Sequence, residues 1–315
     1  MNENNVFKLG TRGSPLALWQ AERVKSLLEA KRPGAVIELV IIQTSGDKIL
    51  DKPLVQIGGK GVFTKEIEES LIDGAVDFAV HSFKDLPTIQ PPELAIVSIP
   101  ERDSPFDAIL SRSAANLRDL SPHPVIATGS LRRRAQILAL RPDANVVDLR
   151  GNVNTRMRKY RESNWDAMIM ALAGIRRMGW EDQISGALAP EEMLPAPAQG
   201  ALAIEARQQD ERTRELLLSI HDEATAAGVL AERAFLATLE GGCQVPMAAY
   251  AEMQESVLTL HGLIAGLDGA PCIRQMLQGD AKHPIELGKQ LGENILQAGG
   301  WKIIASLQEK NIRRE

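Results

Sequence analysis

Basic side chains recur where predicted strands end and helices begin. These positions supply one ammonium and six guanidinium groups: Lys84, Arg12, Arg132, Arg133, Arg150, Arg156 and Arg177. In parallel α/β folds such positions gather at one edge of the sheet, where ligands bind. Taken singly, each cation is most simply a solvated surface charge. Together they predict a concave cationic site that holds several carboxylates or phosphates through bidentate contacts.

Asp85 is an acid among these bases and directly follows Lys84. The simplest interpretation is that it neutralises this neighbour. The chemical interpretation is that a carboxylate among cations stays ionised. It could then stabilise a positively charged intermediate or relay a proton while the arginines hold an anionic substrate.

A thiol follows two glycines in the stretch Gly241-Gly242-Cys243. Paired glycines permit positive φ angles and leave room beside the cysteine. Taken alone, the stretch favours a helix end followed by a small buried thiol, as most free cysteines are. The alternative is that the loop presents the thiol to a group larger than a proton.

Two other features carry less chemistry. The loop Gly58–Gly61 does not have the spacing of a phosphate-binding P-loop, so we interpret it as a mobile lid. The five histidines show no metal-ligand spacing with either cysteine, so no metal site is expected. His81 lies in a strand pattern and is expected to be packed rather than catalytic.

Strands and helices alternate along the part of the chain that carries these side chains. Ser14 and Ser130 are predicted helix N-caps, and Pro15 suits the first helical position. Ala35–Thr44 is almost continuously apolar, which predicts a strand buried on both faces. Further strands are predicted at Val6–Thr11, Val76–Ser82, Pro124–Thr128, Asn145–Leu149 and Asp166–Leu172.

Local echoes indicate two similar lobes. The stretch Thr11–Leu16 resembles Thr128–Leu131, and Val76–Val80 resembles Trp165–Ile169. Leu188–Gln199 has three prolines and reads as a linker or crossover. After it, Ala201–Ala206 is predicted to be a strand that returns to the first lobe.

The C-terminal part changes character after a long helix predicted at Glu223–Glu240. Short strands are expected at Ala248–Met253, Val257–Ile264 and Ile273–Gln278, followed by helices at Pro284–Ala298 and after Gly300. The predicted fold class is therefore α/β, with two lobes and a small C-terminal α+β domain. We expect a first domain of residues 1–104 with 199–218, a second of 105–198 and a third of 219–315.

Composition narrows the class of protein. The chain has 315 residues, 44% of them hydrophobic, and a net charge of −5. Its start lacks a signal or transit pattern, and no apolar stretch is long enough to cross a membrane. A cytoplasmic protein with two reduced cysteines is expected. Eight Lys or Arg against two acids between Thr128 and Lys159 predict a local anion site rather than nucleic-acid binding.

Six motifs, in order along nearly the whole chain, resemble those of the porphobilinogen deaminase family, also called hydroxymethylbilane synthases. They are Thr11-Arg12-Gly13-Ser14-Pro15-Leu16-Ala17, Gly58-Gly59-Lys60-Gly61, His81-Ser82-Phe83-Lys84-Asp85-Leu86-Pro87, Ser130-Leu131-Arg132-Arg133, Leu149-Arg150-Gly151-Asn152-Val153 and Glu240-Gly241-Gly242-Cys243-Gln244-Val245-Pro246. The resemblance implies two lobes like type II periplasmic binding proteins plus a third α+β domain.

The resemblance also implies a transferase of tetrapyrrole and heme biosynthesis. A dipyrromethane, made from two substrate units, is joined by a thioether to Cys243. Four porphobilinogen molecules are added head to tail with loss of ammonia, and hydrolysis then releases hydroxymethylbilane. Each pyrrole carries an acetate and a propionate, so the growing chain suits a row of arginines. A monomer is expected, with no nucleic-acid or membrane partner and no metal.

Residue roles follow from the same resemblance. Asp85 is the implied catalytic residue, which contacts pyrrole nitrogens, assists deamination and stabilises an azafulvene-like cation. The implied cofactor-binding residues are Cys243, Ser14, Lys84, Asp85, Thr128, Ser130, Arg132, Arg133 and Gly151. The implied substrate-binding residues are Arg12, Lys60, Arg150, Arg156, Arg177 and Gln199.

The chain departs from the family pattern at a few positions. Gly129 stands where many members have serine, Ala198 replaces a frequent glycine, and Gln56 sits where some relatives have lysine. Arg134 extends the usual arginine pair, and Cys272 matches no family motif and is expected to be structural. None of these positions is Cys243 or Asp85.

Two alternative functions remain open from the sequence. A non-catalytic anion-binding protein would share the two-lobed pattern but would need neither a group on Cys243 nor Asp85. A nucleic-acid binder is suggested by Arg132-Arg133-Arg134. The acidic net charge and the lack of aromatics in this basic island argue against it.

Overall fold

The computed structural model describes residues 5–48, 63–239 and 245–312. The chain folds into two compact units. One comprises Met1–Asp103 with Ala201–Ala226, and the other comprises Ser104–Gly200 with Ala227–Glu315. Each unit is built around its own sheets and apolar cores, so each is described by itself.

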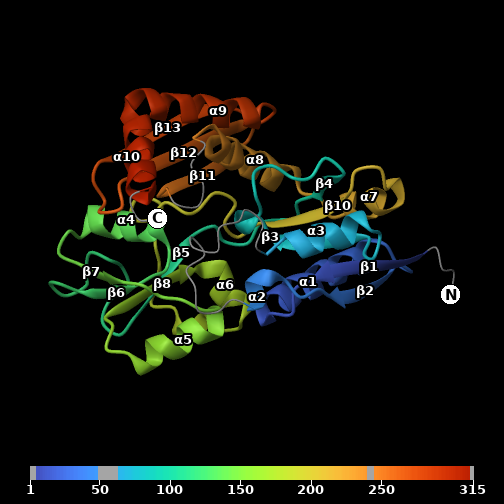
Figure 1. Ribbon diagram of the computed structural model, residues 1–315, viewed down its shortest axis with the longest axis horizontal. Helices are drawn as coiled ribbons and strands as arrows, with labels where there is room; N and C mark the ends of the chain where they lie inside the picture. The colour runs from blue at the N-terminus through green and yellow to red at the C-terminus, as the bar shows by residue number, and fades with distance from the viewer. Residues whose placement is uncertain (1–4, 49–62, 240–244, 313–315) are drawn as a thin grey trace. The chain divides into compact units, whose positions relative to one another are not determined.

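The first unit contains a five-stranded sheet in the order β2-β1-β3-β10-β4 (Figure 1). β1 runs parallel to β2 and β3, whereas β10 is antiparallel to β3 and β4. The pairing of β10 confirms that the chain returns to the first lobe after the intervening segment. The strands are β1 (Val6–Thr11), β2 (Val36–Ile41), β3 (Phe78–Ser82), β4 (Leu94–Ser98) and β10 (Leu202–Arg207).

Helices pack on this sheet through apolar side chains. Val24 and Leu28 of α1 are fully buried in one core with Leu9, Phe78 and Ile204. As predicted, Ser14 caps α1, since its Oγ accepts from Ala17 N at 3.3 Å, and proline follows at the first helical position. The helices are α1 (Pro15–Lys31), α2 (Ser45–Lys48), α3 (Lys65–Ile72), the 3₁₀ turn η3 (Phe83–Asp85) and α7 (Glu211–Leu218).

The second unit contains a five-stranded sheet in the order β7-β6-β8-β5-β9. β6 is parallel to β7 and β8, and β5 is antiparallel to β8 and β9. The strands are β5 (Asp107–Ser111), β6 (Val125–Ala127), β7 (Asn145–Val147), β8 (Ala167–Ala171) and β9 (Gly186–Ala187). Around it lie α4 (Leu131–Leu140), α5 (Val153–Glu162), α6 (Leu172–Arg177) and the 3₁₀ turn η4 (Glu181–Gln183).

The two five-stranded sheets have the same plan. In each, three parallel strands are followed by an antiparallel strand and a further edge strand. β1 corresponds to β6 and β3 to β8, which are the strands at which the sequence echoes occur. The weak echoes therefore reflect two lobes of equivalent topology.

The second unit also holds a three-stranded antiparallel sheet, ordered β11-β12-β13. Its core contains Phe235, Leu260 and Leu291, all fully buried. Its strands are β11 (Met247–Gln254), β12 (Val257–Ala265) and β13 (Cys272–Asp280). Its helices are α8 (Glu223–Thr238), α9 (Pro284–Ile295), the π-helical turn η5 (Leu296–Gly300) and α10 (Trp301–Ile312). The two α/β lobes and this small sheet with helices confirm the predicted fold class.

One local prediction is wrong, and two strands were not predicted. β2 is an edge strand rather than a doubly buried one, and the side chain of Ile41 is 59% exposed. The sequence analysis identified neither β4 nor β5, because each is a short apolar run beside prolines. The segment 188–199, which the sequence predicts to be a linker or a crossover, is a largely buried crossover. In the described part of the chain, no helix has the length and apolarity needed to cross a bilayer.

Candidate functional site

Of the predicted site residues that the structure describes, four lie in the first unit, beyond the ends of two adjacent parallel strands. Arg12 directly follows β1, and its guanidinium lies 4.1 Å from the centre of the Phe63 ring. Lys84 and Asp85 form the exposed part of η3, which directly follows β3. Because β1 and β3 pair in parallel, with Leu9 opposite Phe78, both turns leave the same edge of the sheet. Ser14 begins the helix that follows Arg12.

The turn that carries Lys84 and Asp85 is anchored at its start. Ser82 Oγ accepts from Gln20 Nε2 of α1 at 2.8 Å. The next residue, Phe83, is buried, and its N–H donates to Ala201 O at 3.1 Å. Earlier in β3, His81 contacts Glu205 of β10 at 2.9 Å, which confirms that this histidine is packed. Fixed neighbours therefore hold the two charged side chains at the surface.

In the second unit, Thr128 and Ser130 shape the step from β6 into α4. Ser130 caps the helix as predicted, since its Oγ accepts from Arg133 N at 3.4 Å. Thr128 is buried, and its Oγ1 accepts from Ser130 N at 3.3 Å. Both hydroxyl groups thus already act as acceptors for the turn that positions Arg132 and Arg133.

Arg132 and Arg133 meet at the buried carboxylate of Asp107, the first residue of β5. Arg132 Nη1 donates to Asp107 Oδ2 at 2.7 Å, and Arg133 Nη2 donates to Oδ1 at 2.8 Å. The two arginines are only 6% and 5% exposed, and Asp107 is fully buried. Two cations and one anion leave the trio with a net charge of +1.

This trio stays charged despite its burial. Burial raises the pKa of Asp107, but the charges of Arg132 and Arg133 and their hydrogen bonds outweigh it and hold the pKa far below its usual value. Burial also lowers the pKa of Arg132, and the charge of Asp107 opposes that shift. A fork-shaped guanidinium remains charged at any physiological pH.

Gln199 and Arg177 extend the same cluster. Gln199 is buried, and its Nε2 donates to Asp107 Oδ1 at 2.8 Å and to Pro105 O at 2.7 Å. Arg177, at the end of α6, donates from Nη2 to Gly200 O at 2.6 Å. The structure therefore brings together four predicted residues, namely Arg132, Arg133, Gln199 and, through the adjacent backbone, Arg177.

A second group of predicted residues surrounds the start of α5. Arg156 Nε donates to Gly151 O at 2.7 Å, and Gly151 has a positive φ of 114°. Arg150 is half-exposed and pairs with Asp148 at 2.8 Å. Lys159 Nζ donates to Arg150 O at 3.2 Å. These contacts form a basic turn at the end of β7, as the sequence predicted.

The remaining predicted residues, Lys60 and Cys243, lie outside the described residues, as does the expected lid at Gly58–Gly61. Asp85 belongs to the first unit and the arginine cluster to the second. Asp85 and the arginine cluster are therefore described separately, each within its own unit.

The sequence analysis missed two buried acids of the second unit. Asp107 opens a strand of apolar residues, and Glu232 lies in an alanine-rich stretch of α8. Both are fully buried. An acid at the head of an apolar strand, or within an apolar helical stripe, is the signal that could have found them, because such a charge needs a buried partner.

The cationic residues fit a dipyrromethane bearing acetate and propionate groups. The two buried guanidinium groups outnumber their one carboxylate partner, and two further arginines surround Gly151. Arginine forks match carboxylates geometrically, and a net positive cluster attracts them. The chemistry of these side chains is thus that of a site for several carboxylates.

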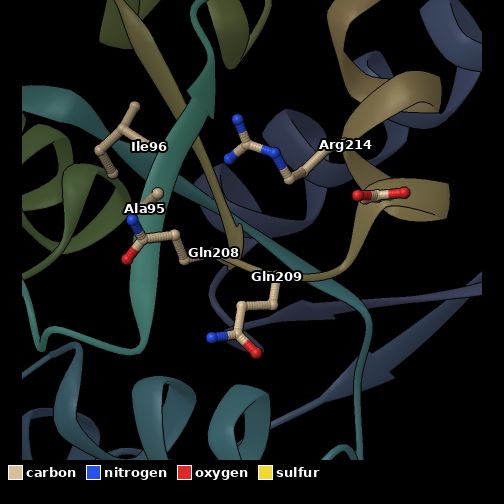
Figure 2. Close-up of a pocket in the computed structure, with 6 residues that line it drawn as sticks. Ala95, Ile96, Gln208, Gln209 and Arg214 are labelled. Atoms are coloured by element: carbon tan, nitrogen blue, oxygen red, sulfur yellow. The ribbon is translucent and has the colours of Figure 1, made fainter.

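A pocket of about 710 Å³ in the first unit has a different character. Figure 2 shows it beside β4 and the turn that follows β10. Its lining is mainly polar and contains no predicted site residue: Ala95, Ile96, Gln208, Gln209, Glu211 and Arg214. We therefore assign the candidate site to the strand ends rather than to this pocket.

Among solved structures, two that are partly similar to this chain are named as solute-binding proteins. A putative methionine-binding lipoprotein from Bacillus subtilis is 11% identical, with a TM-score of 0.42 over 70% of this chain and 92% of its own. A TRAP periplasmic solute binding protein from Desulfovibrio salexigens is 11% identical, with a TM-score of 0.43 over 69% of this chain and 72% of its own.

Sequence comparison identifies the family. The family model "Porphobilinogen deaminase, dipyromethane cofactor binding domain" matches residues 7–215, and "Porphobilinogen deaminase, C-terminal domain" matches residues 226–297. A porphobilinogen deaminase of Syntrophotalea carbinolica is 47% identical over 96% of both chains. One of Geobacter metallireducens is 47% identical over 98% of this chain and 97% of its own. The chain therefore belongs to the porphobilinogen deaminase family.

Proposed function

We propose that this protein condenses four porphobilinogen molecules head to tail on a dipyrromethane held by Cys243, releasing ammonia at each addition. Hydrolysis then releases hydroxymethylbilane, so that the protein acts as a transferase. As a member of the family, it is an enzyme of tetrapyrrole synthesis with a dipyrromethane cofactor-binding domain. When bound, the dipyrromethane supplies the primer that the substrate units extend.

One observation carries this proposal beyond family membership. Two adjacent guanidinium groups, those of Arg132 and Arg133, share the single carboxylate of Asp107 in a buried setting. Such a cluster keeps a net positive charge without the mobility of exposed side chains. A preorganised cation of this kind favours anionic groups because little reorganisation is needed on binding.

We assign the binding roles to the strand-end residues. The cofactor would be held by Cys243, with contacts from Ser14, Lys84, Asp85, Thr128, Ser130, Arg132, Arg133 and Gly151. The acetate and propionate groups of substrate and product would be bound by Arg12, Lys60, Arg150, Arg156, Arg177 and Gln199. Because every added pyrrole brings two carboxylates, a distributed set of arginines suits a lengthening product better than one strong site.

Asp85 is the proposed catalytic residue. Its side chain is exposed on a turn that is anchored at Ser82 and Phe83. Gln20 and Ala201 are the partners of these two residues. A carboxylate held in this way can contact a pyrrole N–H, stabilise the cation that forms when ammonia leaves, and accept or pass on a proton. Lys84 beside it can bind a substrate carboxylate.

The proposal includes the organisation of the chain. Its three domains are residues 1–104 with 199–218, 105–198 and 219–315. The separate apolar core around Phe235, Leu260 and Leu291 supports the third. The protein would act as a monomer in the cytoplasm, where reducing conditions keep the Cys243 thiol free to react.

Turnover by an Asp85→Asn variant tests the catalytic assignment. We expect porphobilinogen consumption to fall by about 100-fold or more, since the amide cannot supply the charge or accept the proton. Binding of substrate should persist, because the arginines are intact. Asp73→Asn is the matched control, since Asp73 is an exposed carboxylate of the same unit. Near-normal turnover by Asp85→Asn would remove this residue from its role.

A further inference from the structure

The buried crossover at residues 188–199 is held by side chains of α4 and by the backbone of β11. Gln136 of α4 accepts from Leu194 N at 2.8 Å and donates to Leu194 O at 2.9 Å. Arg132 Nη1 also donates to Leu194 O at 2.8 Å, and Ala249 N of β11 donates to Pro195 O at 3.1 Å. A buried segment without regular structure needs such partners for its backbone groups. The crossover is therefore a fixed part of the second unit.

Ala198 has an unusual backbone conformation within this crossover. Its φ is +61°, in the left-handed region that residues with a Cβ rarely adopt, and its side chain is fully buried. Gln199 follows directly, and its amide reaches Asp107 and Pro105. The left-handed residue thus sets the direction from which Gln199 approaches the arginine cluster.

Glu232 of α8 holds this residue in place. Its Oε2 accepts from Ala198 N at 2.6 Å, and its Oε1 accepts from Ala251 N of β11 at 2.9 Å. Glu232 is fully buried, so each of these hydrogen bonds to a carboxylate is stronger than a bond between neutral groups. One side chain therefore joins α8, the three-stranded sheet and the crossover.

We propose that Glu232 is a positioning residue of the cofactor site: by holding Ala198 in its left-handed conformation, it keeps Gln199 on Asp107 and so fixes Arg132 and Arg133. The contacts run from Glu232 to Ala198 N, from Gln199 to Asp107 Oδ1, and from Asp107 to both arginines. α8 is also the helix that leads, along the chain, to Cys243. The same carboxylate thus ties the arginine cluster to the element that precedes the attachment point.

The residue type at position 198 makes Glu232 important in this chain. Glycine adopts a φ of +61° without steric cost, whereas alanine does not. With alanine present, the hydrogen bond that Ala198 N donates to Glu232 offsets part of that cost. Removing the bond should let the crossover relax, and restoring glycine should make the bond less necessary.

The test uses Glu232→Gln and measures cofactor acquisition. The glutamine amide keeps the size of the side chain, but it replaces one carboxylate oxygen with an NH2 group that cannot accept. One of the two backbone N–H groups therefore loses the oxygen that it faces. Apoprotein from a host that lacks porphobilinogen is incubated with porphobilinogen, and the gain in intact mass is followed over time. We expect loading to slow by about 10- to 100-fold, as a displaced binding group causes. Circular dichroism should show an unchanged fold.

Two further variants separate positioning from general stability. Glu223→Gln makes the same change at an exposed position of the same helix and should load as fast as the wild type. Ala198→Gly combined with Glu232→Gln should recover much of the lost rate, because glycine holds the required φ unaided. If Glu232→Gln alone does not fold, a folded and loading double variant supports the proposal, and an unfolded one contradicts it.

The inference rests on the proposed function, and the outcomes distinguish the two. A wild-type protein that never gains the mass of a dipyrromethane would overturn the function itself. A wild type that loads, together with a folded Glu232→Gln variant that loads equally fast, would overturn only the positioning role. A slow single variant that glycine at position 198 does not rescue would likewise contradict it.

Discussion

At the scale of single residues, the site depends on buried charge pairing as much as on cations. The strand-end arginines could be predicted, because each follows an apolar run or a helix cap in the sequence. Their partner Asp107 could not, because it lies 25 and 26 positions away from Arg132 and Arg133 along the chain. Only the packing of β5 beside β8 brings it to the arginines. Arg132 and Arg133, which the sequence predicts to bind carboxylates of the bound molecules, thus also bind a carboxylate of the protein itself.

Replacing Asp107 with asparagine should strongly destabilise the protein. The change leaves two buried guanidinium groups without a countercharge, and breaking a buried pair costs about 3–5 kcal/mol. The free energy of unfolding, measured with denaturant, checks this expectation. Glu162→Gln is the control, because it breaks an arginine pair of α5 that is exposed to solvent. Such a pair contributes at most about 1 kcal/mol. Equal effects of the two substitutions would contradict the buried pairing.

The effect of Asp107→Asn should depend on pH in a defined direction. Because the pKa of Asp107 is lowered in the folded protein, its stabilising contribution is fully present above the unfolded pKa of about 3.9. The stability difference between wild type and variant should therefore stay constant from pH 7 to pH 5. It should begin to shrink as the pH falls below about 4. A difference that changes between pH 7 and pH 5 would show that another group titrates.

At the scale of elements, close backbone approach explains why glycine stands at position 129 of this chain. Gly129 lies between β6 and the cap of α4, and a Cβ at this position would lie 2.3 Å from Leu149 O. The sequence analysis singled out this glycine but gave no structural reason for it. The reason for it depends on the segment after β7, which only the fold brings alongside. A side chain here would push apart the two segments that carry Thr128 and Arg150.

We therefore expect Gly129→Ser to destabilise this chain by about 1–3 kcal/mol, as overpacking does. Denaturant unfolding measures the effect. Gly174→Ser is the matched control, since a Cβ at Gly174 would meet nothing within 4 Å. A stability change no larger than that of the control would show that the turn adapts to serine without strain.

The same scale shows which elements the sequence could not predict. The starts of α1 and α4 could be predicted from their N-caps, Ser14 and Ser130, because capping is a local interaction. The prediction that β2 is buried on both faces was wrong, because a strand's position in the sheet depends on its partners rather than on its own apolar run. The left-handed Ala198 also gave no local signal, since the residues that hold it lie on α8.

At the scale of the whole molecule, the chain builds two α/β lobes of equivalent topology and returns to the first through β10. Asp85 belongs to one unit, whereas the arginine cluster and the three-stranded sheet belong to the other. The proposed chemistry therefore draws on residues from both units. A covalent primer on Cys243 would keep the growing product attached to the enzyme between additions.

The intact mass of the purified protein tests this account most directly. Wild-type protein made in a porphobilinogen-producing host should exceed its sequence mass by one dipyrromethane. Cys243→Ser should have only its sequence mass, whereas Cys272→Ser, which changes an exposed cysteine outside the proposed site, should keep the added mass. A folded wild-type protein from the same host with no added mass would contradict the account.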